Sequence, residues 1–184
     1  MSENNLKTKK LISLGPSGRA VAEPMDDVLL GNFYEHLTME RYANVQYFSI
    51  YLWFQERDLD GFASYFLSES KGEMEHSYKF ANYLIARGQN VNLKELPAPI
   101  QNWDSIEDLI SYSFNMEADL TSSLQQLYSI SERISDTRTN VFLDPIIDAQ
   151  TKSEDELAHI LGKVKFASNQ PSAILLIDSD LNKK

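Results

Sequence analysis

The sequence predicts an all-α fold: a bundle of four long amphipathic helices in two hairpins, with a long crossover between helices two and three and a short fifth C-terminal helix. Two observations predict it. Apolar residues recur every three to four positions in four long segments, the period of a helix with one buried face. Segments with glycine, proline and aspartate separate them. The chain has 184 residues, 42% of them hydrophobic, which suits one domain with a sizeable core.

The first hairpin is expected in the N-terminal half. Residues 1–23 lack helical periodicity and contain two glycines and a proline, so we expect a flexible N-terminal arm before a bundle domain over residues 24–184. The first helix should run from about Met25 to Arg57, where the sequence Asp-Leu-Asp-Gly turns the chain. The second should end near Gly88, a residue typical of C-terminal caps. The short turn makes these helices antiparallel neighbours.

The second hairpin follows a long connection. Residues 89–104 contain two prolines and have no helical period, which predicts the crossover. Ser105 begins a sequence that resembles a capping box and should open the third helix. A turn at about residues 135–140 leads to a fourth helix that should end near Asn169. The short apolar stretch after Pro171 suits the fifth helix.

The most informative motif is Glu73-Met-Glu-His76 on the second predicted helix. At about 100° per residue, Glu69, Glu73 and His76 interrupt an otherwise aromatic stripe on one helix face. Buried carboxylates cost free energy unless they are paired, hydrogen-bonded or bound to a metal. A Glu-x-x-His pair alone is usually a solvated surface feature, but its position on an apolar face favours a metal site.

The other three long helices repeat this pattern. The first carries Glu40 two turns before Tyr47, the third carries Glu117, and the fourth carries Gln150 and Glu154, all on the predicted apolar face. Each helix therefore presents an oxygen ligand toward the interior. The absence of cysteine excludes thiolate ligands and leaves oxygen and imidazole to hold a metal.

Composition restricts the partners. The formal net charge of −10 argues against nucleic acid, which needs a basic surface. In an oligomer that encloses a space, the same charge would attract cations. No apolar run approaches the roughly 18 residues of a membrane span, and the N-terminus lacks the apolar core of a signal peptide. We therefore expect a cytoplasmic protein with no membrane partner.

Together these motifs resemble the ferritins, the iron-storage family, over about residues 25–180. Inward glutamates on two hairpins joined by one long crossover are the established pattern of the ferritin-like four-helix bundle. The tract N-W-D-S and the run S-D-T-R-T-N-V-F-L-D-P look closest to cyanobacterial ferritins. The elements that match are Glu40 and Tyr47 in E-R-Y-A-N-V-Q-Y, Glu73 and His76 in G-E-M-E-H, Glu117 in N-M-E-A-D, and Gln150 in D-A-Q.

The resemblance implies a diiron centre within each subunit. Glu40, Glu73 and His76 would bind one iron, with Glu73 bridging to a second iron that Glu117 also binds. Gln150 would complete the centre by hydrogen bonding to a bound water or oxygen species.

Other residues have two interpretations. Tyr47 would donate an electron when oxygen is reduced, or it is an ordinary hydrogen-bonded core aromatic. Glu69 and Asp144 would pass iron from the centre to a cavity, although Asp144 could instead only favour the first turn of the fourth helix. His36, one turn before Glu40, is either a transient iron ligand or a buried histidine with satisfied hydrogen bonds. The third iron site of many bacterial ferritins is not expected, because the corresponding positions are Gly72, Ala149, Lys152 and Ser153.

The implied function is iron storage and detoxification by a ferroxidase. It would oxidise ferrous iron with oxygen or hydrogen peroxide and deposit ferric mineral inside a shell of 24 subunits. Haem is not expected, because Met74 lies off the core face and the second Glu-x-x-His pair, Glu156 and His159, points away from the bundle centre. Two alternatives are another diiron enzyme on the same bundle and a helical interaction module whose buried acids pair with Arg or Lys.

Overall fold

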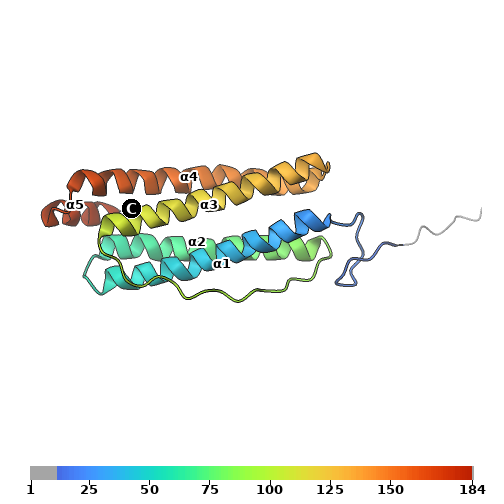
Figure 1. Cartoon of the computed structure of the whole chain (residues 1–184), viewed down its shortest axis with the longest axis horizontal. Coiled ribbons are helices and arrows are strands. Elements are labelled where there is room, and N and C mark those ends of the chain that lie inside the picture. Colours follow the sequence, from blue (N-terminus) through green and yellow to red (C-terminus); the bar gives the residue numbers. More distant parts are fainter. Residues whose placement is uncertain (1–11, 184) are drawn as a thin grey trace, which may run out of the picture.

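The computed structural model describes residues 12–183, and in that range it contains five α-helices and one isolated bridge but no extended strand (Figure 1). The first two helices form one antiparallel hairpin and the next two form another. This confirms the predicted all-α bundle with its crossover and short C-terminal helix. In chain order the helices are α1 (Asp27–Gln55), α2 (Asp60–Ala86), α3 (Ile106–Arg133), α4 (Thr137–Ala167) and α5 (Pro171–Leu181).

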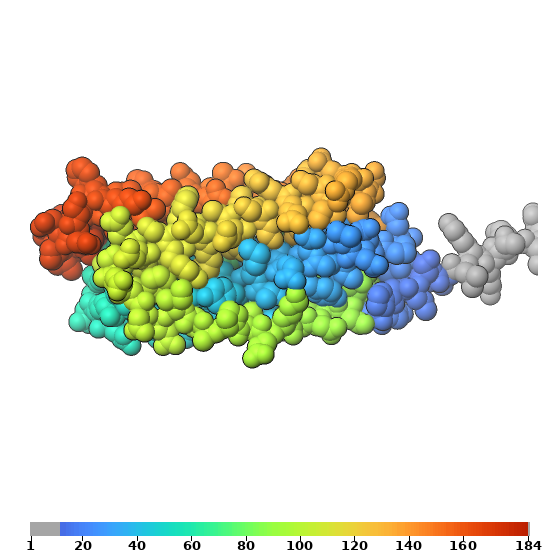
Figure 2. Space-filling view, viewed as in Figure 1, coloured from blue at the N-terminus to red at the C-terminus, as the bar shows by residue number. Residues whose placement is uncertain are grey.

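The two hairpins lie side by side along the length of the bundle (Figure 1). Helix α1 packs against α2 and α3, α3 packs against α4, and α5 lies at one end of the bundle against α2 and α4. Figure 2 shows the crossover, in green, covering one flank of the α1–α2 hairpin. One face of each long helix is therefore turned toward a common interior. Among the described residues, no helix is long and apolar enough to cross a membrane.

Side-chain and glycine caps define several helix ends. The Asp26 carboxylate caps α1 by accepting hydrogen bonds from two backbone N–H groups of its first turn. The Ser105 hydroxyl accepts a hydrogen bond from the N–H of Asp108 at 3.1 Å, which confirms the predicted start of α3. Gly88 follows α2 with a φ of +77°, the left-handed backbone that glycine favours, as its predicted capping role requires.

Helix α5 extends beyond its apolar stretch and contacts the start of α2. The first residue of α2 follows Leu59, whose side chain makes no capping hydrogen bond. Asp178 of α5 supplies that cap, since its carboxylate accepts a hydrogen bond from the N–H of Phe62 at 2.9 Å. Gly61 allows the approach, because a Cβ there would lie 1.8 Å from the carbonyl oxygen of Asp178.

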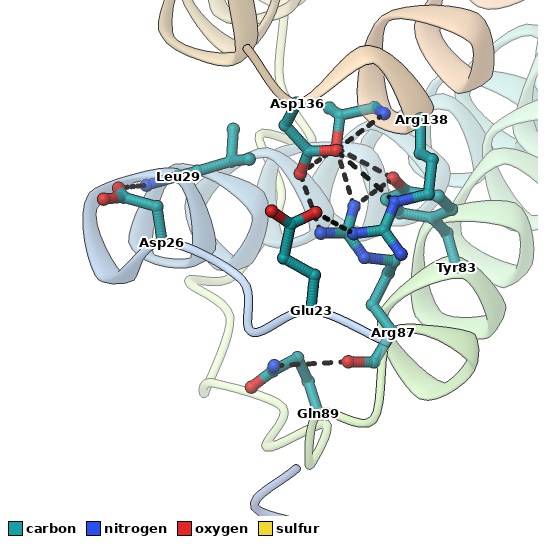
Figure 3. Close-up of polar contacts among 9 residues, drawn as sticks. Glu23, Asp26, Leu29, Tyr83, Arg87, Gln89, Asp136 and Arg138 are labelled. Carbon is teal, nitrogen blue, oxygen red and sulfur yellow. Dashed lines mark hydrogen bonds and ion pairs between the residues drawn. The ribbon is translucent and has the colours of Figure 1, made fainter. Parts of the chain in front are cut away.

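A buried ion pair joins the end of α2 to the turn before α4 (Figure 3). The guanidinium of Arg87, a residue that is 6% exposed, lies 2.7 Å from the Asp136 carboxylate and donates a hydrogen bond to the Tyr83 hydroxyl at 2.6 Å. Arg138 lies beside Asp136 and pairs with Glu23 at 3.1 Å. This cluster connects both hairpins with the segment that precedes α1.

A turn formed by residues 13–21 packs against the end of α2. Ser17 donates to the carbonyl oxygen of Gly88 from its backbone N–H at 3.1 Å and from its hydroxyl at 2.8 Å. A Cβ at Gly15 would lie 2.4 Å from the same oxygen, so this contact requires glycine. Residues 1–11 of the expected N-terminal arm lie outside the described residues, and the division into arm and bundle domain stays a prediction.

Two apolar clusters fill the bundle and leave a polar zone between them. The cluster nearer α5 includes Ala43, Tyr47, Phe66 and Leu157, and the other includes Leu37, Phe80 and Ile146. The predicted polar residues of α1, α2 and α4 fall between these two sets in the sequence of each helix. They are Glu40, Glu73 and Gln150.

Candidate metal centre

Two carboxylate side chains and one imidazole converge where the two apolar clusters meet. One ligand atom each from Glu40 of α1 and from Glu73 and His76 of α2 lie within 4.8 Å of one another. Glu40 is 2% exposed and Glu73 is 4% exposed, and His76 is half-buried. The three-residue spacing places Glu73 and His76 on the same helix face. The structure therefore brings together three of the residues that the sequence predicted as ligands.

Glu117 and Gln150 form a second part of the same polar zone. The Gln150 side-chain amide donates to one carboxylate oxygen of Glu117 at 2.7 Å. The Tyr47 hydroxyl donates to the other. Glu117 is fully buried, and its charge contributes to the raised pKa of Glu73, so the two parts interact electrostatically. Helices α1, α3 and α4 thus contribute to one set of hydrogen bonds around this carboxylate.

Glu40 carries an observation that tests whether a cation fits. Its Oε1 lies 2.8 Å from Nε2 of His36, whereas its Oε2 is buried without a hydrogen-bond partner and lies 3.5 Å from Nδ1 of His76. Nδ1 of His76 is also 3.1 Å from the Glu73 carboxylate. A buried oxygen without a partner is costly, and a divalent cation between these groups would satisfy it.

When no cation is bound, burial and neighbouring groups shift the pKa values of these three side chains. Burial raises the pKa of Glu73 well above its usual value. Burial acts on Glu40 in the same direction, but the hydrogen bond with His36 and the nearby His76 imidazole outweigh it and lower its pKa. The nearby Glu40 carboxylate and the hydrogen-bonded Glu73 carboxylate raise the pKa of His76 to about 10. A cation would therefore compete with a proton on His76, as is usual for imidazole ligands.

Tyr47 lies beside this centre. Its side chain on α1 is fully buried and packs against Phe66 of α2, with the centroids of the two rings 5.6 Å apart. Burial and the Glu117 charge raise the pKa of its hydroxyl well above the usual value, so the hydroxyl keeps its proton and donates to Glu117. The structure contains the hydrogen bond that the core interpretation requires. The electron-donating role stays a prediction.

The two predicted transfer residues lie in different surroundings. Glu69 is half-buried on α2, one turn before Glu73. Burial, followed by the charges of Glu117 and Glu156, raises its pKa to about 7. Asp144 is exposed and lines a separate pocket of about 450 Å³ between α3 and α4. Glu69 thus lies next to the centre along α2, whereas Asp144 lines a different pocket.

One of the two interpretations of Asp144 needs correction. Asp144 does not stabilise the first turn of α4, because that helix begins at Thr137, two turns earlier. Glu156 and His159 are exposed, which agrees with their predicted orientation away from the bundle centre. The charge of Glu156 also contributes to the raised pKa of Glu69. Met74 is 38% exposed, which agrees with its predicted position off the core face.

Sequence patterns missed the partners that come from α3. His36 is fully buried, and both of its nitrogens are hydrogen-bonded, to Glu40 and to the Ser123 hydroxyl. The interpretation as a satisfied buried histidine is confirmed. The hydroxyl of Thr121 donates to Glu154 in a similar way. Small hydroxyl residues carry no signal of their own on a helix, so only packing could identify these contacts.

The buried acids do not pair with basic side chains in the part of the chain that the structure describes. No Lys or Arg among residues 12–183 makes a salt bridge with Glu40, Glu73 or Glu117. Their partners are imidazole, phenol and amide groups. This counts against the interaction module, which required compensating Arg or Lys.

Sequence and structure comparisons with known proteins all find ferritins. The family model described as "Ferritin-like domain" matches residues 32–167. A bacterial non-heme ferritin from Bacteroides fragilis is 25% identical over 150 residues, covering 82% of this chain and 93% of that protein. A solved structure of a PmFTN variant soaked in iron is 30% identical, with a TM-score of 0.80, and covers 84% of this chain and 98% of that one. An open pore ferritin from Archaeoglobus fulgidus shares the fold, with a TM-score of 0.84 at 21% identity over 88% of this chain and 99% of that chain.

Proposed function

This chain belongs to the ferritin family, and we propose that it stores iron and oxidises ferrous iron at the buried centre between its four long helices. Iron is the substrate and the cargo in this proposal. The observation that carries it is the unpartnered Oε2 of Glu40, which is buried beside His76 and Glu73. Hard carboxylate oxygens and one imidazole favour the ferric product over the ferrous substrate.

Each residue of the centre has a proposed role. Glu40 and His76 bind one ferrous ion, Glu73 bridges it to a second, and Glu117 binds the second. Gln150 holds the carboxylate of Glu117 through its amide, which donates at 2.7 Å. Two ferrous ions supply two electrons, which with two protons reduce oxygen to hydrogen peroxide, or hydrogen peroxide to two molecules of water.

The surrounding residues have supporting roles in the proposal. Tyr47 can supply one of the two electrons in place of a ferrous ion, becoming a neutral tyrosyl radical as its phenolic proton passes to Glu117. Glu69 accepts ferric iron as it leaves the centre, which its position one turn from Glu73 supports. Asp144 acts later in this transfer, because it is exposed and away from the centre. Haem takes no part.

The mineral would form inside a hollow shell of 24 subunits in the cytoplasm. The formal net charge of −10 per chain supports this, since many acidic copies around an enclosed space would concentrate ferrous ions. Iron would then be stored in a form that does not react with cellular oxidants.

Anaerobic titration with ferrous iron, followed by rapid mixing with oxygen, tests the proposal. We expect fast oxidation to saturate at two ferrous ions per subunit, because the positions of a third site are Gly72, Ala149, Lys152 and Ser153. In the structure, Lys152 pairs with Asp148 at 2.7 Å on the exposed face of α4. Saturation at three ions would contradict the two-iron centre, and no fast phase would contradict the ferroxidase.

A further inference from the structure

We infer that His36 is a positioning residue for the iron centre: it holds Glu40 so that one carboxylate oxygen is occupied and the other faces the metal ligands. The inference rests on the proposed function, which assigns Glu40 as a ligand. His36 is itself no ligand in this scheme. It acts only through Glu40, one helical turn further along α1.

Three helices hold the His36 ring in place. Its Nε2 lies 2.8 Å from Oε1 of Glu40 on α1, and its Nδ1 lies 2.9 Å from the Ser123 hydroxyl on α3. The ring packs against Phe80 of α2, with centroids 4.4 Å apart. The residue is fully buried. The ring therefore has little freedom to rotate, and the carboxylate that it contacts is held with it.

The hydrogen bonds also determine which ring nitrogen carries the proton. A carboxylate can only accept, so Nε2 must donate to Glu40. In a neutral ring, Nδ1 then accepts from the Ser123 hydroxyl. Neither nitrogen has a lone pair free for a metal, which excludes the alternative that His36 is a transient ligand in this arrangement.

The consequence lies at the second oxygen of Glu40. Because Oε1 accepts a hydrogen bond from His36, the oxygen without a partner is Oε2, which is buried 3.5 Å from Nδ1 of His76. Without His36, the carboxylate could rotate or use both oxygens differently. Groups that orient a ligand in this way typically change metal affinity by about 10–100-fold when they are removed.

Cobalt(II) is a suitable probe, because it binds such ligands without oxidation by oxygen and its visible absorption reports coordination. We would titrate the full-length protein with Co²⁺ and follow heat and absorption. His36→Leu removes the donor at similar volume and should weaken one binding step about 10–100-fold. His36→Gln keeps a side-chain N–H donor and should remain within about threefold of the wild type. The Co²⁺ affinity of Ser123→Ala should lie between those of the two His36 variants.

A kinetic readout separates positioning from general damage. His36→Leu should raise the ferrous concentration for half-maximal oxidation much more than it lowers the maximal rate. Ser131→Ala serves as a matched control, since this buried serine on α3 donates only to the Tyr128 carbonyl. Its Co²⁺ binding should equal that of the wild type. Circular dichroism and thermal melting would establish that each variant folds.

Unchanged Co²⁺ affinity and absorption in a folded His36→Leu variant would overturn the inference. Equal losses in His36→Gln and His36→Leu would overturn it too, because they would mean that the imidazole itself is required. If His36→Leu does not fold, the Co²⁺ affinity of Ser123→Ala tests the inference instead. An affinity equal to that of the wild type would refute it. Failure of the proposed function is distinguishable, since the wild type would then show no fast ferrous oxidation whatever happens at His36.

Discussion

At the scale of single residues, the proposed centre consists of side chains that are costly to bury, and one oxygen of Glu40 has no hydrogen-bond partner. Burial is the largest influence on the pKa of Glu73 and Glu117, and it raises both. A buried carboxyl group costs free energy to desolvate, even where it is hydrogen-bonded as Glu117 is. The cation that we propose to bind at this site would offset that cost.

Glu73→Ala is expected to abolish rapid iron oxidation and leave the bundle folded. As the proposed bridge, Glu73 should matter more than an orienting group, so the rate should fall by more than about 100-fold. Stability should stay within about 1 kcal/mol of the wild type or rise, because a desolvated acid is removed. Stopped-flow oxidation and thermal unfolding measure both. Glu75→Ala, an exposed neighbour on the same helix, is the control, and a wild-type rate in folded Glu73→Ala would refute the site.

Tyr47→Phe removes a hydroxyl and keeps the ring that packs against Phe66. The variant should still bind two ferrous ions but lose a transient radical signal after oxygen is added, and it should oxidise the pair more slowly. Unfolding free energy should fall by about 1–2 kcal/mol, because Glu117 loses a buried hydrogen-bond donor. Freeze-quenched electron paramagnetic resonance provides the measurement. A radical that persists in this variant would exclude Tyr47 as its source.

At the scale of helices, contacts between the ends of elements hold the two hairpins in register. Arg87 links α2 to the turn before α4 (Figure 3), and Asp178 of α5 caps the start of α2. Both contacts join segments that are far apart in sequence. The position of Glu73 and His76 opposite α1, α3 and α4 depends on them, because both residues lie on the helix that these contacts hold at its two ends.

Asp136→Asn should destabilise the protein by about 2–3 kcal/mol at pH 7, because Arg87 loses a buried partner. Burial alone would raise the pKa of Asp136, but the hydrogen bond and charge of Arg87 outweigh it and lower the pKa below 3.8. The pair therefore stabilises the fold above about pH 3.8, and this contribution is lost as the pH falls through the folded-state pKa.

Urea unfolding of the wild type and Asp136→Asn at pH 7 and at lower pH would measure this difference. The difference between the unfolding free energies of the two proteins should decrease only below about pH 3.8. Asp148→Asn is the control, because Asp148 and Lys152 form an exposed pair and should contribute less than about 0.5 kcal/mol. A gap that stays constant down to acid unfolding would contradict the ion-pair explanation.

Gly61→Ala should displace α5, because the new Cβ would lie 1.8 Å from the carbonyl oxygen of Asp178. We expect a loss of about 1–3 kcal/mol and faster proteolysis near residue 170. Gly162→Ala has no neighbour within 4 Å of its Cβ and should stabilise α4 by about 0.5–1 kcal/mol. Thermal unfolding with limited proteolysis measures both, and a neutral Gly61→Ala would mean that α5 adjusts without cost.

At the scale of the whole molecule, the proposed function needs an enclosed volume that a single bundle does not provide. The chain leaves large apolar side chains exposed on α4 and α5, with Phe166 at 93%, Leu175 at 59% and Leu176 at 70%. Exposed apolar residues at one end of a bundle are costly in an isolated subunit. Contacts with further copies would remove this cost.

Gel filtration with light scattering should give a particle of roughly 500 kDa, because 24 copies of a 21.0-kDa chain have about that mass. Electron microscopy after iron loading should show dense cores inside hollow particles. A monomer or dimer that still oxidises ferrous iron would contradict the storage proposal and favour the alternative of another diiron enzyme.

The helices, their order and the principal ligands were readable from the amino-acid pattern. Helical periodicity is local, so Glu73 and His76 could be placed on one face and Glu40 on another helix's buried face from spacing alone. Gly88 and the Ser105 cap were predictable for the same reason, since caps depend on a few adjacent residues. The all-α bundle follows from these features, and the family follows from the resemblance of the motifs that carry Glu40, Glu73, His76 and Glu117.

Contacts between different helices depended on how far each helix is rotated and shifted along its neighbours, which no single-helix pattern encodes. That geometry brings Ser123 to His36, and Tyr47 and Gln150 to the two oxygens of Glu117. It also turns Asp144 away from the centre and places Asp178 over the start of α2. These contacts come from side-chain packing across helices, because a shift of one turn along an axis would exchange every one of these partners.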